Sequence, residues 1–148
     1  MFLTIHELSP KRFASKPYAS QYEILKSRAE VFLLEQKIIC QDLDDKDRSS
    51  IHCFFTDKNR VVAYLRAFSS GDDTVTIGRV LTLEHGKGLG RELMKRSLEE
   101  IKNHFGNKKT LVHAQKQAEE FYAKMGFNAV SDEYLEEGIV HVTMEKNI

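Results

Sequence analysis

The segment from residue 75 to residue 105 constrains the fold most, because its pattern changes from strand to helix across a cluster of glycines. Residues 74–83 are rich in β-branched and apolar side chains, which predicts a strand. After Gly86, Gly88 and Gly90, apolar residues recur at three- and four-residue spacing as far as Phe105. That spacing predicts an amphipathic helix that packs against a sheet.

A glycine-rich turn at the start of a helix has a definite chemistry. The first four N–H groups of a helix have no partner within it, and the helix dipole adds about half a positive charge at that end. Glycines allow the backbone to approach a ligand closely. The turn therefore predicts a site for phosphate or pyrophosphate built mainly from main chain, to which Lys87 and Arg91 add charge.

Two familiar phosphate-binding loops do not fit this turn. A Walker loop needs Ser or Thr after Gly-Lys, whereas Gly86-Lys87 is followed by Gly88. A dinucleotide-binding turn has the spacing G-x-G-x-x-G within a βαβ unit, whereas this one has G-x-G-x-G and follows predicted antiparallel strands. A glycine-rich turn without any ligand remains an alternative at this point.

The remaining sequence predicts a mixed α/β chain in a single domain, residues 1–148, with the element order β-α-β-β-β-α-β-α-β-β. Pro10 and Pro17 mark a loop, and Ser20 with Glu23 predicts a helix N-cap. Short turns between three successive strands indicate an antiparallel meander. Predicted strands span residues 2–7, 51–56, 60–68, 74–83, 110–114, 127–134 and 139–144, and predicted helices span residues 21–34, 89–105 and 117–125, the last ending at Gly126.

Composition excludes several classes of function. Lys and Arg total 22 and Asp and Glu total 22, so the net charge is zero and a non-specific nucleic-acid binder is not expected. Cys40 and Cys53 form neither a disulfide framework nor a metal-binding motif, which favours reduced thiols, no metal and a cytoplasmic location. No apolar run reaches the ~20 residues of a membrane helix, and no signal peptide is expected.

Residues 35–50 are the least regular part of the chain. A calcium loop is rejected, because its fifth, sixth and twelfth positions would hold Lys46, Asp47 and Cys53. We expect a solvated acidic loop, which could still lie beside a cationic substrate. Its acidic residues are Asp42, Asp44, Asp45 and Asp47.

A second motif lies about thirty residues after the glycine turn, where residues 121–127 read Phe-Tyr-Ala-Lys-Met-Gly-Phe. Together, the turn and this motif resemble the GNAT superfamily of acyl-CoA-dependent N-acetyltransferases, and nearly the whole chain resembles its ElaA-like branch. Further supporting segments are residues 28–36 (RAEVFLLEQ), 78–80 (GRV), 114–115 (AQ) and 137–141 (EGIVH).

The resemblance implies a GNAT-like acyl-CoA N-acyltransferase fold, with a mostly antiparallel central sheet flanked by helices and with acetyl-CoA as co-substrate. It implies that the pantetheine arm pairs with a strand that splays from its neighbour, and that the diphosphate lies on the glycine turn. His85 stands where the family usually has Arg or Gln, and the connection before the turn is about two residues short. The cofactor-binding residues so implied are Val80, Leu81, Thr82, His85, Gly86, Lys87, Gly88, Leu89, Gly90, Arg91, Gln115 and Tyr122.

The resemblance also implies direct attack of an amine on the thioester, with Tyr122 as the general acid. A phenol has an ordinary pKa of about 10 and a thiol of about 8.5, and we expect the phenol to protonate the departing sulfur. The alternative is a tyrosine that only packs. The candidate bases, in no fixed order, are Glu35, His52, Glu137 and His141, of which Glu35 and His141 form the catalytic set with Tyr122.

The predicted function is transfer of an acetyl group from acetyl-CoA to a primary amine of an unidentified small molecule or peptide. A non-catalytic acyl-CoA sensor is one alternative, and an interaction domain that binds no CoA is another. No nucleic-acid or membrane partner is expected, and a homodimer is possible because relatives often dimerise. Arg79 is expected to be a paired or site-lining residue rather than a catalyst.

Overall fold

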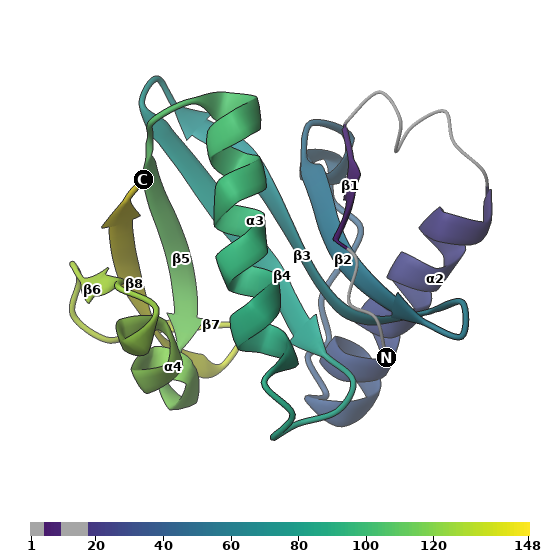
Figure 1. Ribbon diagram of the computed structural model, residues 1–148. Helices are drawn as coiled ribbons and strands as arrows, with labels where there is room; N and C mark the ends of the chain where they lie inside the picture. The colour runs from purple at the N-terminus through teal and green to yellow at the C-terminus, as the bar shows by residue number, and fades with distance from the viewer. Residues whose placement is uncertain (1–4, 10–17) are drawn as a thin grey trace.

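The computed structural model describes residues 5–9 and 18–148, and in that part of the chain the strands form one eight-stranded sheet (Figure 1). The strand order is β1-β2-β3-β4-β5-β8-β6, with β7 paired to β8. The strands are β1 (His6–Leu8), β2 (Ile51–Asp57), β3 (Arg60–Gly71), β4 (Thr74–Thr82), β5 (Lys109–Gln115), β6 (Asn128–Ala129), β7 (Tyr134–Glu136) and β8 (Ile139–Asn147). The helical segments are α2 (Tyr18–Arg28), π-helical η1 (Ala29–Glu35), α3 (Leu89–Phe105), α4 (Glu119–Lys124), and the short 3-10 turns η2 (Asp45–Arg48) and η3 (Lys116–Ala118).

The sheet is mixed, as the sequence predicts. β2, β3 and β4 form the predicted antiparallel meander. The pairing of β4 with β5 is parallel, and α3 forms the crossover between them. β8 then lies antiparallel beside β5. The mixed α/β class and the mostly antiparallel sheet are thereby confirmed.

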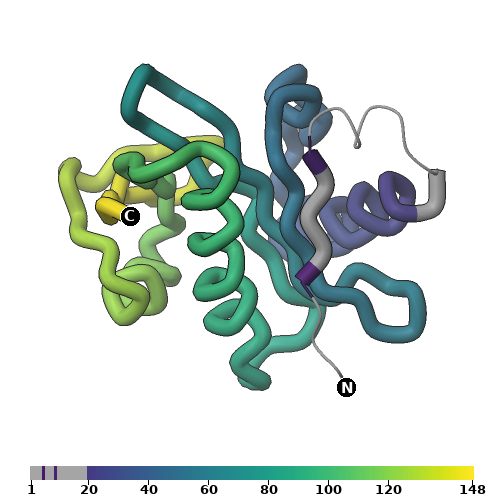
Figure 2. Tube along the Cα trace, turned by 45° about the horizontal axis from the view of Figure 1, so that its top comes forward, coloured from purple at the N-terminus to yellow at the C-terminus, as the bar shows by residue number. Residues whose placement is uncertain are grey.

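Helices cover the two faces of the sheet, with α3 on one side and α2 on the other (Figures 1 and 2). Successive strand residues point to opposite faces, so Leu65 of β3 joins the core under α3 while Tyr64 joins the core under α2. The α3 side is the larger core and includes Phe55, Leu65, Ile77, Leu93, Met94, Ile101, Val112, Phe127 and Met144. The α2 side contains Ile24, Val31, Phe54, Val61, Tyr64 and Leu81.

The predicted helix over residues 89–105 is confirmed with the same bounds, but the first helix differs from its prediction. It begins at Tyr18, so Ser20 lies inside its first turn and is not the N-cap. From Ala29 the chain widens into the π-helical η1, whose end is marked by a hydrogen bond from Gln36 N to Val31 O at 2.8 Å. The loop predicted around Pro10 and Pro17 lies outside the described residues, as does the first half of the strand predicted over residues 2–7, whose second half overlaps β1.

The continuous strand predicted over residues 127–134 is wrong. Only Asn128–Ala129 and Tyr134–Glu136 pair with β8, and the chain between them leaves the ladder. There the Ser131 hydroxyl accepts the backbone N–H of Thr143 at 2.9 Å, in place of a carbonyl. The turn from β7 to β8 has left-handed backbone at Glu137 and Gly138, which suits a tight two-residue hairpin.

None of the helices in the described part of the chain is long and apolar enough to cross a membrane.

Candidate functional site

β4 and β5 separate halfway along their length. Parallel pairing begins at Thr74 with Lys109 and ends at Ile77 with Val112. Beyond that point Gly78–Thr82 pair only with β3, and His113–Gln115 pair only with β8. The facing edges of the two strands therefore have backbone groups that no strand satisfies, and Figure 1 shows the strands diverging toward the β4–α3 loop.

A bulge in β4 accompanies this separation. In the ladder with β3, Tyr64 pairs with Leu81 and Arg66 pairs with Gly78, so Arg79 and Val80 together oppose Leu65. Arg79 has a φ of 54°, in the left-handed region. Such a bulge adds one residue and bends the strand, and residues 80–82, which follow Arg79, do not pair with β5. Val80, Leu81 and Thr82, the predicted pantetheine-binding residues, lie along this edge.

The glycine turn leads from the open end of β4 into α3. Gly86 and Gly88 have φ values of 79° and 73°, and neither has an atom within 4 Å of where a Cβ would lie. The first helical hydrogen bond of α3 runs from Glu92 N to Gly88 O at 3.1 Å, and no side chain caps the helix. Among described residues, the backbone N–H groups of residues 86–91 have no backbone acceptor. The turn is thus an exposed set of donors at a helix N-terminus, which suits an anion.

The side chains around this turn lie at its rim. Lys87 forms an ion pair with Glu84, whose hydrogen bond and charge raise the pKa of the Lys87 ammonium. Arg91 is exposed and has no ion pair with any described residue. Leu89, by contrast, is buried in the core under α3, so only its backbone can face a ligand.

Tyr122 lies on the α3 side of the sheet, in α4. Phe121 packs at the start of α3, with its ring 3.6 Å from where a Cβ on Gly90 would lie. The Tyr122 ring packs edge-on between Phe121 and Phe127, at centroid distances of 5.1 and 5.8 Å. Burial raises the pKa of its hydroxyl above the ordinary value of 10. Within the described part of the chain that hydroxyl has no hydrogen-bond partner, yet it is not among the fully buried unpaired atoms.

The other candidate catalytic residues lie on the α2 side, at the same end of the sheet. Glu35, at the end of η1, accepts a hydrogen bond from His85 of the glycine turn, with Oε1 and Nε2 2.9 Å apart. Next to it, the Gln36 side chain accepts a hydrogen bond from Gln115 of β5 at 2.8 Å. η1 therefore bridges the open ends of β4 and β5.

His141 is buried in β8, directly opposite Gln115 in the ladder. Its Nδ1 donates to Ile139 O at 2.7 Å, and its Nε2 lies 3.4 Å from the Glu136 carboxylate. The contact at Nε2 is an ion pair only when the ring carries a second proton, so Nδ1 is the nitrogen with a hydrogen bond. The structure therefore places Glu35, His85 and Gln115 together, and His141 lies beside Gln115 on the neighbouring strand β8. Tyr122 lies on the opposite face of the sheet.

The acidic loop is not solvated as expected, because three of its four aspartates bind arginines from other elements, and only Asp45 pairs with an exposed neighbour, Arg48 at 3.6 Å. Asp47 is buried and binds Arg28 at 2.7 Å and Arg66 at 2.9 Å. Asp44 binds Arg66 at 2.6 Å, and Asp42 binds Arg28 at 2.9 Å and Arg79 at 2.8 Å. We call these three aspartates and their three arginines the Arg–Asp cluster. The loop's charge is therefore neutralised by arginines of α2, β3 and β4, and it gives no support for a cationic acceptor.

Burial and pairing set the charges of this cluster. Burial alone would raise the pKa of Asp47, but the hydrogen bonds and charges of Arg28 and Arg66 outweigh it and lower that pKa. The hydrogen bond from Arg66 likewise lowers the pKa of Asp44. The Asp47 and Asp44 carboxylates are thus anions that neutralise the guanidinium groups beside them.

His52 is a structural residue. Its Nε2 donates to Asp47 O at 3.0 Å and its Nδ1 accepts from the Tyr64 hydroxyl at 2.7 Å, since a carbonyl can only accept. Burial lowers the pKa of His52 from 6.5 to about 4. His52 is therefore enclosed and only weakly basic, and neither property suits a base that must take a proton from a substrate.

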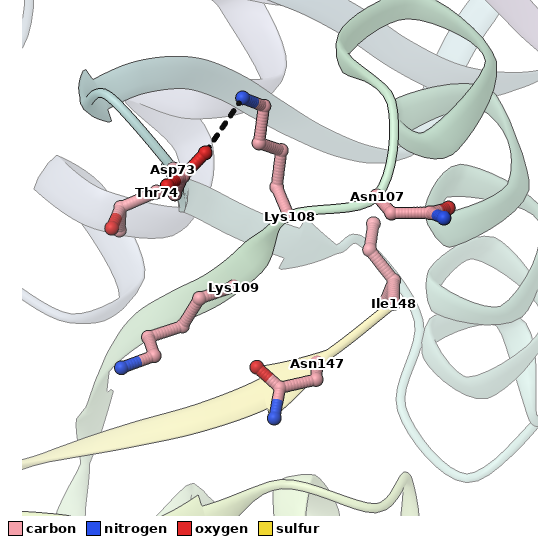
Figure 3. Close-up of a pocket in the computed structure, with 7 residues that line it drawn as sticks. All are labelled: Asp73, Thr74, Asn107, Lys108, Lys109, Asn147 and Ile148. Atoms are coloured by element: carbon pink, nitrogen blue, oxygen red, sulfur yellow. Dashed lines mark hydrogen bonds and ion pairs between the residues drawn. The ribbon is translucent and has the colours of Figure 1, made fainter.

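A separate hollow lies at the opposite end of the sheet, where β4 and β5 begin (Figure 3). Its lysines already have acidic partners, since Lys108 lies 3.3 Å from Asp73 and Lys109 lies 3.4 Å from Glu145. Among the residues that the structure describes, no three His, Cys, Asp or Glu side chains are grouped to hold a metal ion. The lining residues are Asp73, Thr74, Asn107, Lys108, Lys109, Asn147 and Ile148.

Two features of the site escape prediction from the residues alone. The bridge from Gln36 to Gln115 joins positions 79 residues apart, so no local spacing indicates it. The Arg–Asp cluster joins four segments, although the run of aspartates is visible in the sequence. The fold is needed to show which arginine each aspartate binds, and this pairing changes the interpretation of the run from a solvated loop to a buried cluster.

Comparisons with known proteins agree with this geometry. Residues 17–148 match the family model described as an acetyltransferase (GNAT) domain. The chain is 38% identical to a UPF0039 protein of Schizosaccharomyces pombe, over 90% of this chain and 92% of that protein. It is 35% identical to the protein ElaA of Escherichia coli, over 86% of this chain and 87% of that protein.

Solved structures show the same likeness. An acyl-CoA N-acyltransferase from Pseudomonas aeruginosa superimposes with a TM-score of 0.89 at 30% identity, covering 98% of this chain and 99% of that one. The crystal structure of Escherichia coli ElaA superimposes with a TM-score of 0.88 at 30% identity, with the same coverage. The predicted acyl-CoA N-acyltransferase fold and the resemblance to ElaA are confirmed.

Proposed function

Because the chain belongs to the GNAT acetyltransferase family, we propose that it transfers an acetyl group from acetyl-CoA to a primary amine. The observation that carries the proposal is that two sets of backbone groups without hydrogen-bond partners among the described residues meet at one place. The open edge of β4 ends at a glycine turn whose N–H groups have no backbone acceptor in the described chain. A strand edge suits the amide-rich pantetheine arm, and a helix N-terminus suits the diphosphate.

In this proposal the pantetheine amides pair with the backbone of Val80, Leu81 and Thr82, and the diphosphate lies on the N–H groups of residues 86–91. Lys87 and Arg91 add charge at the rim. Gln115 stands at the end of β5, across the gap from β4, and is held by Gln36. Binding of both reactants in line supplies much of the acceleration in a direct transfer.

The reaction is the attack of a neutral amine on the thioester carbonyl. The new C–N bond forms, the C–S bond breaks, and the electron pair of that bond leaves with the sulfur. A phenol is a weaker acid than a thiol, and burial of Tyr122 increases the difference, so the phenol cannot drive complete protonation of a free thiolate. Tyr122 instead donates a hydrogen bond as charge grows on sulfur, and any proton it gives up is replaced by one from the acylated nitrogen.

The amine must lose its proton before it attacks. Glu35 and His85 lie at the surface and contact each other, so together they offer an accessible proton acceptor. His141 is enclosed, and its Nδ1 donates to a backbone carbonyl. We therefore assign proton acceptance to Glu35 together with His85. His141 lies next to Gln115 in the sheet and is given no role in proton transfer.

Thiol release from acetyl-CoA, measured against a broad panel of amines, tests the proposal. We expect free CoA to accumulate with at least one class of primary amine and not without it. Calorimetric binding of acetyl-CoA without thiol release would favour a non-catalytic acyl-CoA sensor. Failure to bind acetyl-CoA at all would contradict both functions.

A further inference from the structure

We propose that Arg79, clamped by Asp42, is a positioning residue that keeps β4 bulged and open toward the pantetheine arm of acyl-CoA. This inference rests on the proposed function. It assigns to a side chain on the α2 face a role in shaping the backbone edge that the cofactor would contact.

The backbone at Arg79 is the first observation. Its φ of 54° lies in the left-handed region, where bulges of this kind usually carry glycine. A residue with a side chain remains there only when its surroundings hold it. The bulge of Arg79 and Val80 lies within the open edge, two residues after Ile77, the last residue of β4 that pairs with β5.

The side chain of Arg79 supplies such a hold. Its Nε lies 2.8 Å from Asp42 Oδ1, and its Nη2 donates to Asp42 O at 3.0 Å. A third contact, at 3.6 Å, joins Nη2 to Asp44 Oδ2. The guanidinium group thus forms an ion pair with the side chain of Asp42 and donates a hydrogen bond to its backbone carbonyl.

Asp42 is itself anchored to the body of the protein. Its Oδ2 and its carbonyl oxygen accept hydrogen bonds from Arg28 at 2.9 and 2.8 Å. Arg28 is completely buried and also binds Asp47. The clamp therefore connects the bulge to the rigid centre of the Arg–Asp cluster.

Arg79 is also the dispensable member of that cluster. Without it, Asp42 retains Arg28, and Asp44 retains Arg66, so no buried carboxylate loses its last partner. The Arg79 side chain is 26% exposed, whereas Arg28 is 0% and Arg66 is 3% exposed. A change at Arg79 should act on the bulge and leave the folded core intact.

The test compares two ligands by calorimetry on the full chain. CoA contacts both the glycine turn and the β4 edge, whereas 3′-phosphoadenosine 5′-diphosphate has the diphosphate but no pantetheine arm. Arg79→Gln should weaken CoA binding about tenfold, equal to about 1.4 kcal/mol, and change binding of the fragment by less than about twofold. Arg79→Gly, which adopts the left-handed backbone readily, should restore CoA binding to within about threefold of the unmodified protein.

Arg60→Gln is the matched control, because Arg60 also starts from a strand and pairs with Glu30 of η1, but its φ is not positive. It should leave binding of both ligands unchanged. Equal weakening of both ligands by Arg79→Gln, unchanged CoA binding, or an Arg79→Gly variant no better than Arg79→Gln would overturn the inference. If the unmodified protein binds neither ligand, the proposed function itself is wrong and the inference ends with it.

Discussion

Tyr122 packs between two aromatic rings, and its hydroxyl has no hydrogen-bond partner in the described chain. The hydroxyl therefore makes no contact there that would stabilise the fold. We predict that Tyr122→Phe keeps the free energy of unfolding and the affinity for CoA nearly unchanged. Turnover should fall by about a hundredfold, at the lower end of what a positioned proton donor supplies. Unaltered turnover would remove Tyr122 from the mechanism.

Tyr64 provides the matching control on the other face of the sheet. It is also buried, at 0% exposed against 7% for Tyr122, but its hydroxyl donates to His52 at 2.7 Å. Tyr64→Phe should lower the free energy of unfolding by about 1 kcal/mol, the usual value of a hydrogen bond, and leave turnover per folded molecule unchanged. Steady-state thiol release and urea unfolding together separate the two roles.

The pKa of His52 predicts how stability depends on pH. It is about 4 in the folded chain and 6.5 ordinarily, so between these values the unfolded state binds the additional proton. Stability is therefore complete above about pH 6.5, and about 3 kcal/mol is lost as the pH falls toward 4. Urea unfolding across this range checks the effect, and a His52→Gln variant with the same slope would contradict it.

At the scale of elements, the glycine turn has a backbone that only glycine adopts easily. Gly88 has a φ of 73°, and an alanine there would cost about 1 kcal/mol or more in backbone strain. We predict that Gly88→Ala lowers both stability and affinity for CoA, measured by thermal unfolding and calorimetry, because the N–H groups of the turn are displaced.

Gly106 allows the two effects to be separated. It ends α3 with a φ of 84°, and space for a Cβ is equally open there. Because its ψ of −167° lies in a region that essentially only glycine adopts, Gly106→Ala should lower stability at least as much as Gly88→Ala while leaving CoA affinity unchanged. Equal losses of affinity in both variants would mean that the turn has no special role in binding.

Elements with a strong local pattern were predictable, and those set by distant contacts were not. α3 follows from its apolar spacing and flanking glycines, and the β2–β4 meander follows from short turns. The widening at Ala29 leaves no mark in apolar spacing, because Val31 and Phe32 suit an ordinary helix equally well. Likewise the break after Ala129 depends on Ser131 bonding to Thr143, which lies on another strand.

For the whole molecule, the Arg–Asp cluster ties the loop before β2 to the centre of the sheet. Arg28 is fully buried and binds Asp42 and Asp47. Arg28→Gln would leave Asp47 buried with only Arg66, and we predict a loss of about 3 to 5 kcal/mol in the free energy of unfolding. Chemical denaturation measures this loss, and a change below about 1 kcal/mol would show that the cluster does not hold the loop.

The site as a whole was only partly predictable. The glycine turn and the 121–127 motif indicate the cofactor side, because close backbone approach leaves glycines in the sequence. The acceptor side depends on the contacts by which Glu35 and Gln36 join η1 to the ends of β4 and β5. It also depends on the open edge of β4, where Arg79 is bulged. None of these has a local signature.

The most direct measurement of the central claim is a titration of the ¹⁵N-labelled chain with CoA, followed by the chemical shifts of its backbone amides. The account predicts that the largest changes fall on residues 86–91 and 80–82, around the glycine turn and the open edge of β4. Changes confined to the hollow near Asp73 and Lys108, or no saturable changes, would contradict it.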